Sequence, residues 1–129
     1  MDVQHYQPAG QPDTSKNFQY SQAVRAGNLL FVAGQPGWDA NMKIPESYED
    51  ECRQVFENIR SVLAEAGCGL ADIVEGMSLH AADADMGIFW RIRNEYLSEP
   101  WPAWTMIANA GLGLPGMHHE VKVTAAIPA

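Results

Sequence analysis

The stretch between Ser47 and Gly67 limits the folds open to this chain more than any other part of the sequence. Ser47 is a favoured helix N-cap with Asp50 three residues later, and Gly67 is a favoured helix stop. The apolar residues in between recur at helical spacing: Cys52, Val55, Phe56, Ile59, Val62, Leu63 and Ala66. Charged residues occupy the other side. Since such a helix buries one face only, the pattern predicts a helix lying on a sheet.

The segments around this helix have strand patterns. Residues 21–26 and 29–33 form two predicted strands joined by a tight turn at Gly27-Asn28. The other predicted elements, after a loop at 35–45 and the first helix, are a strand at 73–80, a second helix capped by Asp83, a strand at 103–108 and a last strand at 120–127. The order β-β-α-β-α-β-β predicts an α+β fold, with a mixed sheet and two helices packed on one face.

The chain has the size of one domain, with 129 residues. Residues 1–17 are polar and rich in Gln and Pro, and they lack the basic and apolar regions of a secretory signal. We interpret them as a flexible N-terminal arm before a single domain at 18–129. No apolar run approaches the roughly 20 residues that span a bilayer.

Charge and cysteine usage narrow the possible partners. The net charge is −8, from 16 acidic and 8 basic residues, which disfavours binding to nucleic acids and to anionic membranes. Cys52 and Cys68 form no CxxC pair, and Cys52 falls on the apolar face of the first helix. We therefore expect a buried thiol, no disulfide and a cytoplasmic location.

The strand at 29–33, Leu-Leu-Phe-Val-Ala, is apolar on both faces. Helices of the same chain can cover one face. The other face needs a cover that a chain this short does not supply, so this strand indicates an oligomer.

Several short motifs, taken in order, resemble those of one family. They are Tyr20–Ala23, Phe31–Gln35, Cys52–Ile59, Ala66-Gly67, Asp72–Val74, Pro102-Ala103 and Val123–Ile127. Together they resemble the RidA/YjgF family of reactive intermediate deaminases, also described as the endoribonuclease L-PSP family. The resemblance implies a chorismate-mutase-like fold and a homotrimer with three small-molecule clefts between subunits. Such a trimer would bury the second face of the strand at 29–33.

The family resemblance also implies a chemistry, the hydrolysis of reactive enamines and imines without a cofactor. An arginine directly after a Pro-Ala pair grips the substrate carboxylate, and a glutamate on the last strand helps to position water. An asparagine on the second helix and backbone groups near the Gly-Gln of the second strand complete the site. On this chain the resemblance implies that Tyr20, Ala33, Gly34 and Gln35 bind the substrate.

This sequence departs from the family pattern at its polar positions. Trp104 follows the Pro-Ala pair in place of the arginine, and Trp90 stands in place of the asparagine. The glutamate position falls on Lys122, while Glu120 lies on the same face of the strand two residues earlier. An indole has one N–H donor and no charge, so the carboxylate clamp is lost from this position and ordinary 2-iminopropionate deaminase activity is not expected.

Two readings of the cleft follow. In the first, Trp90, Trp104 and Met106 form a larger apolar pocket for an aromatic or enamine-like metabolite, and Lys122, Glu120 and His119 or His118 supply the chemistry of a hydrolase or deaminase-like enzyme. In the second, the tryptophans plug the cleft of a non-catalytic trimer that binds a small molecule or a protein. The acidic charge disfavours a third possibility, ribonuclease activity.

The remaining candidates have weaker chemical support. His118 and His119 are neighbours on a strand and point to opposite faces, so we expect no metal site. His80 lies on an apolar strand and is interpreted as an interior or interface histidine. Trp38 either caps the cleft or packs on a neighbouring subunit. The glycine-rich run at 111–116 lacks the ending of a phosphate-binding loop.

Overall fold

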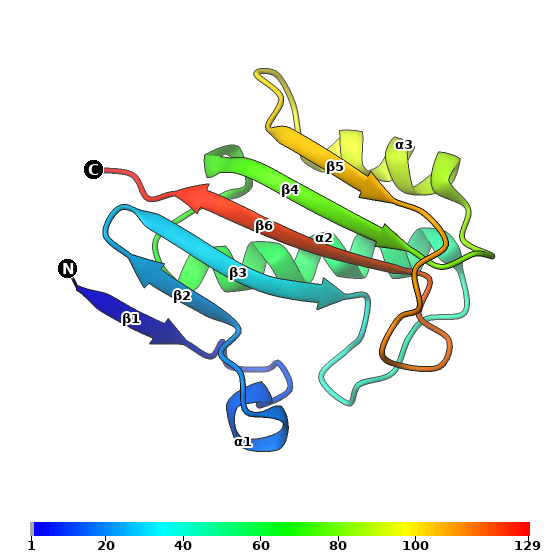
Figure 1. The fold of residues 1–129 in the computed structure, drawn as a ribbon, viewed down its shortest axis with the longest axis horizontal. Coiled ribbons are helices and arrows are strands. Elements are labelled where there is room, and N and C mark those ends of the chain that lie inside the picture. The colour runs from blue at the N-terminus through cyan, green and yellow to red at the C-terminus, as the bar shows by residue number, and fades with distance from the viewer. Residues whose placement is uncertain (1) are drawn as a thin grey trace.

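The computed structural model describes residues 2–129, which form a six-stranded sheet in the order β1-β2-β3-β6-β4-β5 (Figure 1). All neighbouring strands are antiparallel except β4 and β5, which are parallel. The elements are β1 (Val3–Tyr6), α1 (Thr14–Phe18), β2 (Ala23–Ala26), β3 (Leu29–Pro36), α2 (Tyr48–Glu65), a 3-10 turn (Leu70–Asp72), β4 (Ile73–His80), α3 (Met86–Tyr96), β5 (Ala103–Ile107) and β6 (His119–Ala126).

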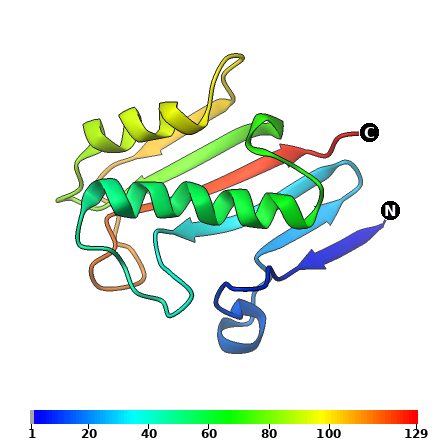
Figure 2. The same ribbon diagram turned by 180° about the vertical axis from the view of Figure 1, so that it is seen from behind.

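The two long helices cover one face of the sheet, which confirms the predicted α+β fold (Figure 2). The apolar stripe of α2 packs on β3 and β6, and its central residues Val55, Phe56 and Ile59 are fully buried. The Ser47 side chain accepts a hydrogen bond from the Asp50 amide, as expected of an N-cap. For α3 the predicted cap is wrong: Asp85, not Asp83, accepts from the Ile88 amide, because the N-cap must directly precede the first helical residue.

The N-terminal segment is not the flexible arm that its composition indicated. Strand β1 pairs with β2 and forms the edge of the sheet, and Asp13 caps α1. The Thr14 side chain is fully buried and donates to the Tyr20 carbonyl at 2.8 Å. Backbone pairing and this buried hydrogen bond hold the segment in place, so the folded unit begins well before residue 18. Strand β3 is also longer than predicted, since Gln35 and Pro36 pair with β6.

The face of the sheet turned away from the helices is uncovered within one chain (Figure 1). Strand β3 places Leu30 and Val32 in the core and leaves Leu29 and Phe31 on the open face, 41% and 43% exposed. Lys122 and Met77 lie on the same open face, opposite each other on β6 and β4. The strand that is apolar on both faces therefore has one face without a cover.

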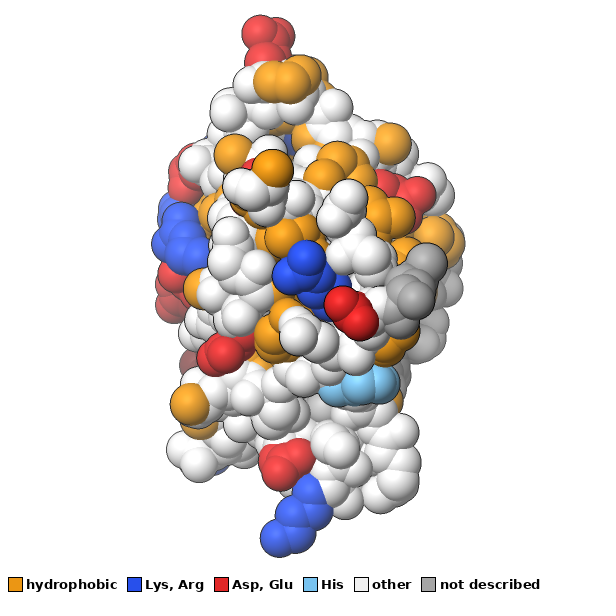
Figure 3. All heavy atoms as spheres, turned by 90° about the vertical axis from the view of Figure 1, so that its left-hand side faces the viewer, with side chains coloured by type: hydrophobic (Ala, Val, Ile, Leu, Met, Phe, Trp, Pro, Cys, Tyr) orange, Lys and Arg blue, Asp and Glu red, His pale blue; other side chains and the backbone are white. Residues whose placement is uncertain are grey.

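Among the described residues, the end of the molecule that carries both termini has no surface dominated by one charge (Figure 3). There, Lys and Arg side chains are scattered among apolar and acidic ones (Figure 3). Within residues 2–129, every helix is too short or too polar to cross a membrane.

Candidate functional site

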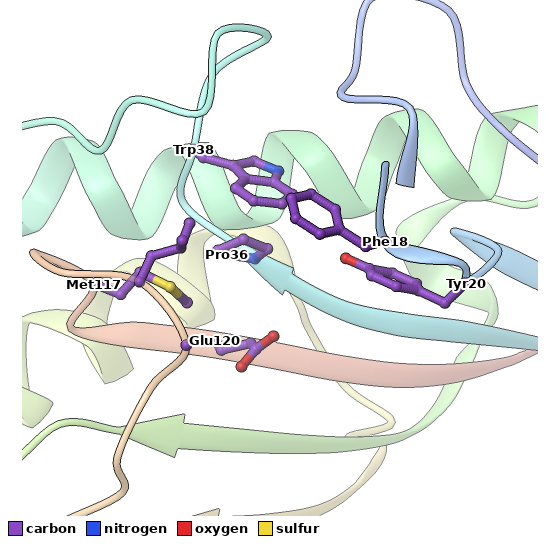
Figure 4. A pocket seen from close by; sticks show the side chains of 8 residues that line it. Phe18, Tyr20, Pro36, Trp38, Met117 and Glu120 are labelled. Atoms are coloured by element: carbon purple, nitrogen blue, oxygen red, sulfur yellow. The ribbon is translucent and has the colours of Figure 1, made fainter. Parts of the chain in front are cut away.

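A hollow of about 280 Å³ opens where β3 ends and β6 begins (Figure 4). Its lining, here called the Glu120 pocket, consists of Phe18, Tyr20, Pro36, Trp38, Gly113, Leu114, Met117 and Glu120. Most of these side chains are apolar, so the carboxylate of Glu120 and the hydroxyl of Tyr20 are the chief polar groups that face the hollow.

The carboxylate of Glu120 lies directly over the backbone of Gly34 on the neighbouring strand. A Cβ atom at position 34 would stand 2.5 Å from Glu120 Oε1, so the approach requires glycine. Burial raises the pKa of Glu120, and among residues 2–129 no cation or hydrogen bond opposes this rise. Burial also raises the pKa of Tyr20, with a smaller contribution from the charge of Glu120. The pocket therefore holds a desolvated carboxyl group near a tyrosine hydroxyl.

Buried amide side chains shape the wall of this pocket. Asn58 on α2 donates to the carbonyls of Pro36 and Trp38, both at 2.9 Å, and so fixes the loop that carries the Trp38 ring. Gln35 donates to Gln22 Oε1 at 2.7 Å and to the carbonyl of Ala33 at 3.1 Å. These bonds lie beside the register shift between Val32 and Gln35, which places Gly34 beneath Glu120.

A second hollow lies at the β5 edge of the sheet, between α3 and β5. Its lining, here called the Arg93 pocket, consists of Trp90, Arg93, Asn94, Trp101, Pro102 and Trp104. The Trp104 ring lies over Gly76 of β4, where an added Cβ would stand 2.3 Å from Trp104 Cζ3. Its indole nitrogen donates to Ser78 Oγ at 3.0 Å. The ring meets Trp90 edge to face, with 6.2 Å between centroids.

Arg93 occupies the space between these two tryptophans. Its guanidinium carbon is 4.2 Å from the Trp90 ring centroid, 4.3 Å from that of Trp104 and 5.5 Å from that of Trp101. The residue is only 3% exposed. Its Nη1 donates to Asn94 Oδ1 at 2.8 Å, while Nε is buried without a partner in the described chain. Burial lowers the pKa of Arg93, and no acid of residues 2–129 offsets this effect.

The structure separates the residues that the sequence assigned to one cleft. Tyr20, Gly34 and Glu120 come together in one place, and Trp90 and Trp104 in another. Gln35 is fully buried and bonded to Gln22, so in this chain it supports the Glu120 pocket from behind. Lys122 is exposed on the open face, and Met106, 43% exposed, lines neither pocket.

His119 is not beside Glu120, and its predicted place in the cleft is wrong. Neighbouring residues of a strand point to opposite faces, so the position of Glu120 turns His119 into the core. There its Nδ1 lies 2.9 Å from Nδ1 of His80, which is also buried. Burial, followed by the neighbouring histidines, lowers the pKa of His119 to about 4.

The histidine pair belongs to a buried polar chain behind the Arg93 pocket. His80 Nε2 lies 2.8 Å from Ser78 Oγ, which also accepts from Trp104. His118 faces another way, and its Nδ1 lies 2.7 Å from Oε1 of the buried Glu51. The other oxygen of Glu51 accepts from the amides of His118 and His119, so these contacts tie the start of β6 to α2.

The two pockets cannot form one site within a single chain. Glu120 points to the open face, whereas Trp104 contacts Gly76 and Ser78 on the helix-covered face. Strands β6 and β4 separate β3 from β5. At about 4.8 Å between strands, the distance from β3 to β5 is on the order of 14 Å.

The fold and these pockets define a small α+β protein with two largely apolar pockets, each containing one buried ionisable side chain, on the two faces of a mixed sheet. Residues 12–127 match the family model described as "Endoribonuclease L-PSP". The chain is 34% identical over 123 residues to the RutC family protein YjgH of Escherichia coli, covering 94% of this chain and 92% of that one. It is 32% identical over 97 residues to Reactive Intermediate Deaminase A, chloroplastic, of Arabidopsis thaliana, covering 74% and 52%.

A solved structure agrees with these matches. RidA from the Antarctic bacterium Psychrobacter superimposes with a TM-score of 0.86 at 30% identity, covering 96% of this chain and 99% of that one. The chain belongs to the endoribonuclease L-PSP family, which is the RidA/YjgF family indicated by its motifs.

Proposed function

We propose that this protein is a hydrolase of the deaminase kind that converts an aromatic imine or enamine to the corresponding carbonyl compound in clefts between the subunits of a homotrimer. The observation that carries the proposal is the desolvated Glu120 carboxyl group in a largely apolar pocket beside Tyr20. The name of the Arabidopsis relative, Reactive Intermediate Deaminase A, supports the same chemistry.

The proposed reaction needs a group that moves protons near neutral pH. Water adds to the imine carbon while the Glu120 carboxylate accepts a proton from it, and the proton passes to the nitrogen. Collapse of the resulting carbinolamine forms the C=O bond and releases ammonia, with one water consumed. A carboxyl group with a raised pKa suits both steps, because it is a stronger base than an ordinary glutamate and its pKa lies closer to the pH at which the protein works.

Assembly into a homotrimer is supported by the uncovered face of the sheet and by the separation of the half-sites. Leu29 and Phe31 leave apolar surface exposed on that face. The Glu120 and Arg93 pockets lie on different faces, so they meet only if one subunit supplies each. A reducing cytoplasm stays the expected compartment, with Cys52 and Cys68 both buried as free thiols.

The test uses imines generated in the cuvette. An amino-acid oxidase acting on phenylalanine supplies the aromatic imine, and a serine dehydratase supplies 2-iminopropionate. We expect clear acceleration of aromatic imine hydrolysis and little of the small one, since three tryptophans favour an aromatic body. Glu120→Gln should reduce the aromatic rate by roughly 10²–10⁴-fold.

The pH profile gives a second measure of the role of Glu120. Because the group acts as a carboxylate, the rate should rise with pH through its pKa, and this limb should lie above the ordinary value of 4.5. No acceleration of either imine, or full activity in Glu120→Gln, would contradict the proposal.

The alternative is a non-catalytic trimer that binds a small molecule or a protein. The observation in its favour is that Trp90, Arg93 and Trp104 already pack against one another at the β5 edge and fill part of the hollow. Ligand binding without turnover of any imine would favour this alternative.

A further inference from the structure

We propose that the Arg93 pocket is a binding site for the carboxylate of a planar, aromatic acid, with Arg93 as its anchor. The inference deepens the proposed function, because the acid group would be that of the substrate. Binding itself does not depend on turnover, however, so the two proposals can fail separately.

The charge of Arg93 is unbalanced within the described chain. A guanidinium that is 97% removed from solvent has lost most of its hydration, and a buried charge ordinarily has an ionic partner. In residues 2–129 no carboxylate lies within ion-pair distance of it, and its Nε has no acceptor. The Trp90 and Trp104 rings offset part of this loss through their faces, but a ring face accepts no hydrogen bond from the edge of the guanidinium.

The neighbours of Arg93 limit the directions from which a ligand can reach it. The two rings stand nearly perpendicular to each other and the guanidinium carbon lies in the corner between them, so an anion must approach from the sides that the rings leave open, where unpaired N–H groups remain. Asn94 engages Nη1 only. A planar carboxylate matches the remaining donors and forms the charge-assisted bonds that Arg makes best.

The walls of the pocket are mostly aromatic and apolar. Trp101 is 49% exposed at its rim, and Pro102 and Trp90 complete an apolar lining around the single cation. Such walls gain from contact with an aromatic body and nothing from a two-carbon acid. The positive charge absent from β5 is therefore supplied by α3, and Trp104 holds it in place.

Two ligands of the same shape separate the effect of the ligand's negative charge from that of its aromatic ring. Phenylacetate and phenylacetamide share their ring and size but differ in charge, and binding is measured by calorimetry and by quenching of tryptophan fluorescence. We expect the unmodified protein to bind phenylacetate at least tenfold more tightly than the amide. Arg93→Met should remove this preference, and Arg93→Lys, which keeps the charge without the planar fork, should retain part of it.

Arg60→Met is the control, since Arg60 also lies over an aromatic ring, that of Tyr96, but pairs with Glu57 at the surface. It should leave the preference unchanged. Protein labelled with ¹⁵N-arginine adds a readout without substitution: the Arg93 Nε–H signal, assigned by its loss in Arg93→Lys, should shift with phenylacetate and not with the amide.

Two results would overturn the proposal: equal affinity for acid and amide, or a preference that persists in folded Arg93→Met. Glu120→Gln separates the two proposals, since it should keep the preference while losing turnover. An intact preference in a protein that hydrolyses no imine would support this inference and contradict the proposed function.

Discussion

The Glu120 and Arg93 pockets are built alike but carry opposite charges. In each, a glycine on the neighbouring strand, Gly34 or Gly76, lets a functional side chain lie flat against the backbone. Each holds a desolvated ionisable group that no opposite charge within residues 2–129 balances. One chain thus presents a carboxyl group on the open face of its sheet and a guanidinium cation at the β5 edge. This difference fits the proposal that the two pockets are complementary half-sites, each completed by a neighbouring subunit.

Gly34→Ala should have the largest effect, because it removes one half-site and spares the other. The new Cβ would stand 2.5 Å from Glu120 Oε1 and displace the carboxylate. We expect kcat/KM for the aromatic imine to fall about 10²-fold, as when a catalytic group is misplaced, with the preference for phenylacetate over the amide unchanged. Gly111→Ala, where a Cβ meets nothing within 4 Å, is the control. Loss of both properties in Gly34→Ala would show that the pockets are not separate.

Gly76→Ala should disturb the other half-site. Its Cβ would collide with the Trp104 ring, and the ring has little room in the stack with Arg93. We expect a loss of about 2–3 kcal/mol in the free energy of unfolding, the range for overpacked sites, together with a weaker preference for the carboxylate. Urea unfolding and the two-ligand titration measure these effects. An unchanged preference would mean that Trp104 does not hold Arg93 in place.

Acid should destabilise the region around the Arg93 pocket first, because the buried pair His80 and His119 lies behind that pocket. His119 has a pKa of about 4 in the folded protein against 6.5 ordinarily, so the unfolded chain binds more protons in this interval. Stability is therefore full above pH 6.5 and declines as the pH falls toward 4, by on the order of 3 kcal/mol. Hydrogen exchange should show β4 and β6 near His80 losing protection before β2. A flat profile between pH 7 and 4 would contradict a neutral buried pair.

Thr14→Val should have the smallest effect, and it should alter the Glu120 pocket without altering the Arg93 pocket. The buried hydroxyl of Thr14 donates to the carbonyl of Tyr20, which places that side chain at the pocket. Its loss should reduce stability by about 1 kcal/mol and imine turnover by a few-fold. Phenylacetate affinity serves as the internal control and should not change.

The sequence predicted most of the fold, because the α2 stripe and the β2–β3 hairpin have strong local patterns. The sequence also grouped Trp90 with Trp104, and their ring centroids are 6.2 Å apart in the structure. It missed Arg93, since a charged helical residue is ordinarily solvent-exposed; the signal available was its position one turn after Trp90, on the same side of α3. It missed β1 because a short polar edge strand depends on pairing across the sheet, not on local pattern.

The alternation of side chains along β6 explains why the prediction of the catalytic residues was partly wrong. Glu120 and His119 were both proposed as catalytic residues of one cleft, but side chains at adjacent strand positions point to opposite faces. Their placement in one cleft was therefore inconsistent with the strand itself. The division of the remaining residues between two pockets was not predictable, because it depends on how β3, β6, β4 and β5 are ordered in the sheet.

Mixed trimers test the central claim, that Glu120 of one subunit and Arg93 of another form one site. Glu120→Gln and Arg93→Met proteins are each expected to be nearly inactive on the aromatic imine at low substrate concentration. When they are unfolded together and refolded at equal ratio, about one quarter of the clefts should receive both intact halves, and about that fraction of unmodified activity should return. Native mass spectrometry would verify the mixed trimers. A mixture containing them but no more active than its parents would contradict the account.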